Sequence, residues 1–298
     1  MVTLISKDNS VVERLASALS ESEGKLLERD YNAIAKEYLA EERAVEQIEY
    51  FKKEITRYSN DYDFKGKKLL EIGAGVGSLI LTARNKYGID AYGVEPSENE
   101  FSPFSEISET LFKEYKLDSN VILNAKAESL PFESNSFDLV YSTNVLEHVD
   151  DPKKVLSESI RVLKPGGYLQ FVIPNYFSLW EGHYEMLWPF ITNKFLAKIY
   201  LKLIGKKTNY VETLNLISPF YLKKVLKSIP YKVQVLSWGQ DIFKNRLGTG
   251  LYSDWAALKK IRWMIILVQK LKIASLIANI MNMFGMYTPI VITLRKLD

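Results

Sequence analysis

The sequence predicts an α/β protein built on a doubly wound, mostly parallel sheet of seven strands. Two observations predict this class. Short apolar runs alternate with stretches at helical spacing between residues 69 and 173, which is the pattern of βαβ units. The run KKLLEIGAGVGS at 67–78 places an apolar strand before three alternate glycines and a helix. Open α/β sheets bind ligands at such a turn, at the carboxyl end of a buried strand.

The other elements follow in chain order. Helices are expected after the glycine turn, at 105–115, from Asp151-Pro152 to about 163, and at 219–228. A tight turn is expected at 164–167, where the sequence reads KPGG. The chain closes with PIVITLR, which has the composition of a buried strand. The seven expected strands are 69–72, 91–94, 121–123, 137–142, 168–173, 231–237 and 289–295.

We expect an N-terminal helical cap at 1–64, with a helix over 33–58, and a main domain at 65–298 that carries two insertions. The insertion at about 175–217 is aromatic and then basic, and the insertion at 241–287 is mostly helical and apolar. Its 263–286 segment is apolar enough to suggest a membrane span, but Lys270 and Lys272 interrupt it. A central Lys costs about 2.5–3.5 kcal/mol to insert. We therefore expect a helical hairpin that packs on the domain or lies on a membrane surface.

Composition and charge limit the classes of function. The 298 residues include no cysteine, which excludes disulfides and thiolate metal sites. The N-terminal residues lack the pattern of a signal peptide, so a cytoplasmic location is expected, with the inner face of the membrane as an alternative. Residues 191–298 contain 18 Lys and Arg against 4 Asp and Glu, a net +14, whereas residues 1–190 carry −11. Either the basic half contacts an anionic partner such as a membrane, or its lysines are solvated helix faces.

Four motifs occur in order: LLEIGAGVG, YGVEPS, AESLPFESNSFDLVYSTNVLEHVDDP and LKPGGYLQFVIPN. This set resembles class I S-adenosylmethionine-dependent methyltransferases, specifically the type 11 family of ubiquinone and menaquinone biosynthesis, over about a third of the chain. The resemblance implies a Rossmann-like methyltransferase fold and S-adenosyl-L-methionine as the cofactor. The glycine spacing G-x-G-x-G also differs from the G-x-G-x-x-G that holds a pyrophosphate, and this cofactor has no phosphate.

The resemblance also implies the cofactor site. Glu71 would lie near the amino-acid end of the cofactor, and Glu95, about 20 residues beyond the loop, would accept from both ribose hydroxyls. In the alternative interpretations, Glu71 is satisfied by backbone amides and Glu95 is a surface carboxylate. Lys126 replaces the family's adenine-binding aspartate and has no acceptor, so adenine recognition would depend more on backbone groups. The implied cofactor-binding residues are Glu71, Gly73, Ala74, Gly75, Gly77, Glu95, Pro96, Ala127, Glu128 and Asn144.

Three residues are candidates for catalysis: His148, His183 and Tyr184. His148 follows the fourth strand, where the cofactor methyl should point, and could act as a general base or bond a loop carbonyl. His183 and Tyr184 belong to the aromatic segment WEGHY, which either holds a hydroxylated acceptor or packs as a lid. No H-x-x-x-H or clustered Asp/His spacing is present, so no metal site is expected.

The sequence therefore predicts a methyltransferase, with O-methylation of a hydroxylated acceptor, such as a glycan or lipid-linked intermediate, as the preferred reaction. Alternatives are a free small-molecule acceptor, such as a quinone precursor or natural product, and a non-catalytic protein that binds S-adenosylmethionine. A nicotinamide-dependent dehydrogenase is the alternative at the level of the fold. Nucleic acid is an unlikely partner, because Ile173-Pro174-Asn175-Tyr176 does not match the N-P-P-[FYW] motif. The pattern does not predict an oligomeric state.

Overall fold

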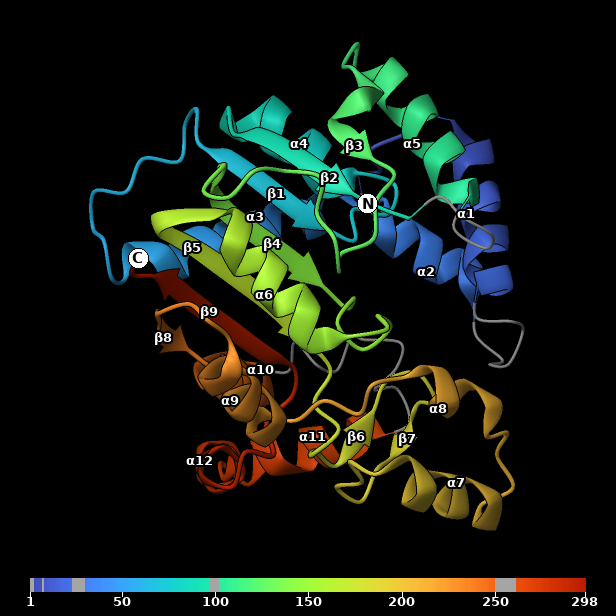
Figure 1. Cartoon of the computed structure of the whole chain (residues 1–298). Helices are drawn as coiled ribbons and strands as arrows, with labels where there is room; N and C mark the ends of the chain where they lie inside the picture. The colour runs from blue at the N-terminus through green and yellow to red at the C-terminus, as the bar shows by residue number, and fades with distance from the viewer. Residues whose placement is uncertain (1–2, 7, 23–29, 97–101, 250–260) are drawn as a thin grey trace.

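The computed structural model describes residues 3–6, 8–22, 30–96, 102–249 and 261–298. A seven-stranded sheet with strand order β3-β2-β1-β4-β5-β9-β8 lies at its centre (Figure 1). The first five strands in this order run parallel, while β9 runs antiparallel to both β5 and β8. The strands are β1 Lys68–Ile72, β2 Asp90–Val94, β3 Ile122–Leu123, β4 Phe137–Thr143, β5 Leu163–Ile173, β8 Val233–Ser237 and β9 Ile290–Lys296.

Helices cover both faces of the sheet, because alternate strand residues point to opposite faces. Leu70 and Val140 face one apolar core, whereas Leu69 and Leu139 face the other. The first core is closed by α6 Pro152–Val162, α9 Pro219–Ser228, α10 Gln240–Thr249, α11 Arg262–Lys270 and α12 Ala274–Met283. The second is closed by α1 Asn9–Ser22, α2 Tyr31–Tyr38, α3 Glu41–Thr56, α4 Ser78–Tyr87 and α5 Ser102–Glu114. The predicted doubly wound fold is therefore confirmed.

Several elements differ in detail from the prediction. The helix expected over 33–58 is divided into α2 and α3, and α3 buries Ile48, Phe51 and Ile55 in the core of the sheet. The N-terminal helices therefore form part of the sheet's covering layer. The turn expected at 164–167 is part of β5, which pairs with β4 through a register shift between Phe137 and Leu139.

The first insertion has an apolar core of its own. It contains the hairpin β6 Trp180–Glu181 and β7 Met186–Leu187, followed by α7 Lys194–Leu203 and α8 Asn209–Thr213. Trp188, Tyr176 and Leu201 are fully buried in it. The second insertion contains α10, α11 and α12; its residues 250–260 lie outside the described residues. Among the described residues no single helix meets the length and hydropathy expected of a membrane span; α11 and α12 meet them only as a pair, bent by 113°.

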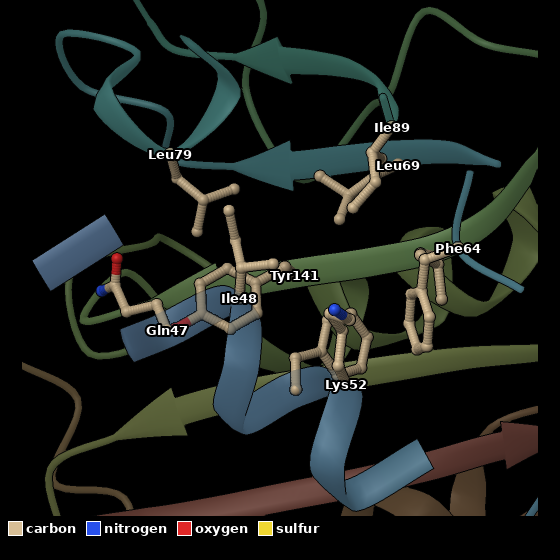
Figure 2. Close-up of a pocket in the computed structure, with 10 residues that line it drawn as sticks. Gln47, Ile48, Lys52, Phe64, Leu69, Leu79, Ile89 and Tyr141 are labelled. Carbon is tan, nitrogen blue, oxygen red and sulfur yellow. The ribbon is translucent and has the colours of Figure 1, made fainter. Parts of the chain in front are cut away.

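A small apolar cavity lies beneath α3, against β1 and β4 (Figure 2). Leu69, Leu139 and Tyr141 form its floor, and Lys52 is the one charged side chain among its lining residues. Its lining is apolar, and it includes none of the glycine-turn residues. This cavity is consequently a packing feature, and the ligand site has to be sought at the carboxyl ends of β1, β2 and β4.

Candidate functional site

The glycine turn joins β1 to α4 at the carboxyl edge of the sheet. Its three glycines have positive φ, at +73° for Gly73, +53° for Gly75 and +79° for Gly77, a conformation that L side chains rarely adopt. A Cβ on Gly73 would lie 2.1 Å from Cγ2 of Val145, whereas a Cβ on Gly75 would meet nothing within 4 Å. Packing therefore requires glycine at position 73, while Gly75 presents bare backbone to open space. This open side is where a ligand can touch the chain.

Glu95 is brought to this turn by the pairing of β2 with β1. The backbone N–H of Gly75 donates to Oε2 of Glu95 at 2.8 Å. Burial raises the pKa of Glu95 to about 7, and the Gly75 hydrogen bond opposes the rise. The carboxylate thus lies beside the glycine turn with Oε1 left for another donor, as the ribose assignment requires.

A buried acid, Glu71, and a half-buried cation, Arg43, lie near Glu95 and the turn. Glu71 on β1 is 8% exposed, and its Oε2 has no hydrogen-bond partner among the described residues. Burial, and then the charge of Glu95, raise the pKa of Glu71 well above its usual range, while the charge of Arg43 lowers it. Arg43 on α3 stacks on the ring of Tyr38 at 4.2 Å, and its buried Nη1 likewise lacks a partner in the described structure.

Buried polar atoms without hydrogen-bond partners, here Glu71 Oε2 and Arg43 Nη1, fit a site that binds a polar ligand. The carboxylate of Glu71 suits an ammonium and the guanidinium of Arg43 suits a carboxylate, so together they fit the amino-acid end of S-adenosylmethionine. Sequence reasoning found Glu71 and missed Arg43. Arg43 belongs to no motif, and only the packing of α3 on the sheet brings it to β1.

The remaining predicted cofactor residues surround the same edge. Ala74 is buried and donates its N–H to Val94 O at 3.1 Å, and Pro96 directly follows Glu95, whereas Ser97 of the YGVEPS motif lies outside the described residues. Ala127 is buried behind β3. Asn144 follows β4 with φ +52° and an exposed side chain.

Glu128 has a partner inside the protein. Its Oε1 accepts from the N–H of Asp150 at 2.8 Å and of Asp151 at 3.4 Å. The side chain therefore anchors the loop before α6, and the adenine edge is left to the backbone around Ala127. This placement does not support a direct contact between the Glu128 carboxylate and a cofactor.

The two histidines, 35 positions apart in the chain, meet in space. The rings of His148, after β4, and His183, in the turn of the β6–β7 hairpin, lie 5.5 Å apart at 88°. Nδ1 of His183 lies 2.7 Å from Oε1 of the buried Glu181. Beneath them lies Glu147, which is fully buried and has no hydrogen-bond partner for either carboxylate oxygen among the described residues.

Electrostatics divide the roles in this cluster. Burial raises the pKa of Glu147 to about 7, with the charge of His183 opposing the rise. Burial also opposes ionisation of Glu181, but the charge and hydrogen bond of His183 hold its pKa below the usual value. Partial burial, and then the charge of His183, lower the pKa of His148, whose side chain is still 37% exposed. Glu181 is therefore the ionised partner of His183, and His148 is a neutral imidazole.

Tyr184 has a different place from the one expected. It is 6% exposed, its N–H donates to Oε2 of Glu181 at 2.6 Å, and its hydroxyl accepts from the N–H of Val211 at 3.1 Å. Burial raises its pKa to about 12. This placement does not support the catalytic role expected for Tyr184, because its side chain packs the insertion and fastens the hairpin to α8.

The insertion is also tied to the loop after β4. Asn215 donates its backbone N–H to Glu147 O and its Nδ2 to Val149 O, each at 2.6 Å. These bonds fix the segment after α8 to the loop after β4. One ligand atom each from Glu147, His148 and His183 lie within 4.8 Å of one another, so these three residues have the chemistry to bind a divalent cation. The spacing in the sequence did not indicate this grouping.

The fold and the glycine turn define a class of protein: a Rossmann-like α/β domain with a candidate ligand site at the carboxyl edge of its sheet. Residues 70–171 match the family described as "Methyltransferase domain". These residues form a class I S-adenosylmethionine-dependent methyltransferase domain, and S-adenosylmethionine is the cofactor of that class. The matches do not distinguish the ubiquinone and menaquinone subfamily.

Individual relatives agree on the class and differ in the acceptor they name. The chain is 35% identical over 116 residues to norajmaline N-methyltransferase of Rauvolfia serpentina, covering 38% of this chain and 39% of the relative. It is 26% identical over 225 residues to the chloroplastic tocopherol O-methyltransferase of Arabidopsis thaliana, covering 69% of this chain and 64% of the relative. A solved geranyl diphosphate methyltransferase shares the fold with a TM-score of 0.51, at 15% identity over 90% of this chain and 81% of that one. The first curated relatives are matched over about two fifths of their length.

Proposed function

We propose that this chain transfers the methyl group of S-adenosylmethionine to a hydroxyl group of an acceptor held under the 175–217 insertion. The observation that carries the proposal is the Glu181–His183 pair, with 2.7 Å between the carboxylate Oε1 and Nδ1. The pair stands beside Glu147 and His148, which lie in the loop four and five residues after β4, at the carboxyl edge of the sheet.

The chain's residues divide the binding of the cofactor between them. Glu71 and Arg43 would hold its ammonium and carboxylate groups, and Glu95 would accept from its ribose hydroxyls. The bare backbone at Gly75 lets the ligand approach the turn closely. When bound, S-adenosylmethionine supplies an electrophilic methyl group on a positively charged sulfur.

Glu181 determines which ring nitrogen of His183 is available. An ionised Glu181 accepts a hydrogen bond from Nδ1–H of His183, so Nε2 of the neutral ring keeps its lone pair and can take a proton from an acceptor hydroxyl. Glu147, whose pKa burial raises to about 7, is fully buried with its Oε1 3.8 Å from Nε2 of His148, so it acts on the acceptor only through the charge that it presents to the two histidines. A hydroxyl has to lose its proton when it is methylated, and this pair can take that proton; an aliphatic amine, which is protonated at neutral pH, would need the same base.

The observations favour two different classes of acceptor. The net +14 of residues 191–298 and the aromatic hairpin favour a glycan or lipid-linked acceptor that carries negative charge. The names of the norajmaline and tocopherol enzymes favour a free small molecule. Because the match covers only part of these relatives, the Glu181–His183 pair and the charge of residues 191–298 carry the proposal.

Isotope transfer from methyl-labelled S-adenosylmethionine tests the reaction, with hydroxylated lipid-linked glycans and free phenols as the two acceptor panels. His183→Ala should lower turnover roughly 100-fold or more and leave cofactor affinity within about twofold. Binding without transfer on either panel would indicate a non-catalytic cofactor-binding protein. If His183→Ala lost cofactor affinity but kept normal turnover at saturation, His183 would contact the cofactor and not the acceptor.

A further inference from the structure

Two segments far apart in the sequence present apolar side chains to solvent at one end of the molecule. In α7, Ala197 and Leu201 face the core of the insertion. The opposite face of this helix is apolar as well, and Leu203 on it is 80% exposed. When a helix is apolar on both faces, its outer face can leave water only by contact with a second apolar environment. The exposed apolar residues of this segment are Phe195, Leu196, Ile199, Leu203 and Ile204.

The second segment comprises α11 and α12. Ile265, Ala274 and Ala278 are the buried residues of these helices. Their outer residues recur at intervals of three and four, which places them on continuous helix faces. Met283 is 73% exposed and Trp263 is 65% exposed. The exposed apolar residues are Trp263, Met264, Leu267, Leu271, Leu276, Ile280, Met283 and Phe284.

A row of aromatic contacts connects the two segments. Phe190, just before α7, lies 5.6 Å from Phe177, which lies 5.2 Å from Phe220 on α9. Phe220 is 54% exposed and faces Gly285, the second residue after α12. Figure 1 shows α7, α11 and α12 at the end of the molecule away from α4 and α5. We call the outer faces of α7, α11 and α12, together with Phe220, the basal surface.

The rim of the basal surface is cationic. Residues 191–240 contain nine lysines and a single acid, Glu212, whose carboxylate pairs with Lys198. Residues 262–294 contain three cations and no acid. Lys202, Lys206, Lys270 and Lys272 are exposed beside the apolar residues. Such side chains can keep their ammonium groups in a polar layer while their stems follow apolar surface.

We propose that the basal surface docks on an anionic lipid bilayer, with its apolar side chains in the boundary between headgroups and acyl chains. Apolar area enclosed by lysines is the pattern of a helix that lies in a membrane interface, and anionic headgroups attract each lysine near them. A second copy of this chain is a poorer occupant, because it would bring two cationic rims together.

This orientation has a consequence for the acceptor, which rests on the proposed function. The β6–β7 hairpin that carries His183 belongs to the same insertion as α7, and Tyr200 of α7 donates its hydroxyl to Leu187 O of the hairpin at 2.9 Å. Docking of α7 therefore brings the acceptor side of the site towards the headgroups. An acceptor anchored in the bilayer could then present a hydroxyl to His183 without leaving it.

Flotation of the full chain with vesicles tests the docking without any methyl transfer. Vesicles of phosphatidylcholine are compared with vesicles in which about a third of the lipid is phosphatidylglycerol. We expect at least tenfold stronger partitioning on the anionic vesicles. Leu203→Ser with Phe195→Ser, and Met283→Ser with Leu276→Ser, should each lower it tenfold or more. Leu297→Ser is the matched control, 54% exposed at the end of β9, and should stay within twofold of wild type.

Charge and self-association complete the test. Lys202→Gln with Lys206→Gln should lower partitioning on anionic vesicles roughly fivefold per lysine. Negligible partitioning on both vesicle types, or double serine variants that bind like wild type, would overturn the proposal. So would light scattering that shows a dimer in the wild type and a monomer in the serine variants, without vesicle binding. Cofactor affinity, measured on the same samples, reports separately on the proposed methyltransferase site.

Discussion

Glu95→Gln is the most informative substitution in the cofactor site. The amide keeps the size of the side chain and the acceptor for the Gly75 N–H, but it removes the charge. Hydrogen bonds to charged groups contribute about 1.5–3 kcal/mol, so the affinity for S-adenosylmethionine should fall roughly 10- to 150-fold. Titration calorimetry measures this loss directly.

Asp90→Asn is the matched control for this substitution. Asp90 begins the same strand, and its carboxylate pairs with Arg84 at 2.7 Å, away from the turn. Its variant should bind the cofactor within about twofold of wild type. Unchanged affinity in Glu95→Gln would mean that Glu95 does not hold the ribose.

The pKa of Glu95 adds a test with a definite sign. In the free protein this pKa is about 7, and ribose hydroxyls that donate to the carboxylate should lower it in the complex. Ionised Glu95 is then the binding form, so affinity should rise about tenfold from pH 6 to pH 8 and level off above. In the Glu95→Gln variant the cofactor affinity should not show this rise between pH 6 and pH 8. An identical pH profile in wild type and variant would refute the reasoning.

Three further predictions follow from the other groups. Arg43→Ala should weaken S-adenosylmethionine tenfold or more but leave 5′-methylthioadenosine, which lacks the amino-acid end, unchanged; equal losses would place Arg43 elsewhere. Gly75→Ala should abolish cofactor binding in calorimetry while lowering the melting temperature only by the strain of its positive φ, whereas Gly73→Ala should unfold more readily because of Val145. Dialysis against EDTA should leave turnover unchanged, because His183 takes the proton; activity lost and then restored by Zn²⁺ would show that Glu147, His148 and His183 hold an ion instead.

Most of the fold was predictable because its signals are local. The glycine turn, the alternation of strands and helices, and the final apolar strand are each contained in a few consecutive residues. The direction of β9 carries no local signal, since the same residues pair parallel or antiparallel. The division between α2 and α3 was also missed, because the helix pattern continues across residues 39 and 40.

The site was predictable only where one motif carries it. Glu95 reaches Gly75 because two neighbouring parallel strands end at the same edge. Arg43 and the meeting of His148 with His183 depend on how α3 and the hairpin pack, which no spacing encodes. The sequence could not indicate that Tyr184 is buried, because the surrounding WEGHY segment has the residue types of an acceptor site, and only the packing on α8 brings its hydroxyl to the Val211 N–H.

A crystal structure of the full chain with S-adenosylhomocysteine tests the central claim most directly. We predict that the ribose hydroxyls donate to Glu95, that the amino-acid end meets Glu71 and Arg43, and that the sulfur faces Glu147, His148 and His183. A ligand bound with its sulfur turned away from these three residues would contradict the account, as would a folded protein that binds no S-adenosylhomocysteine.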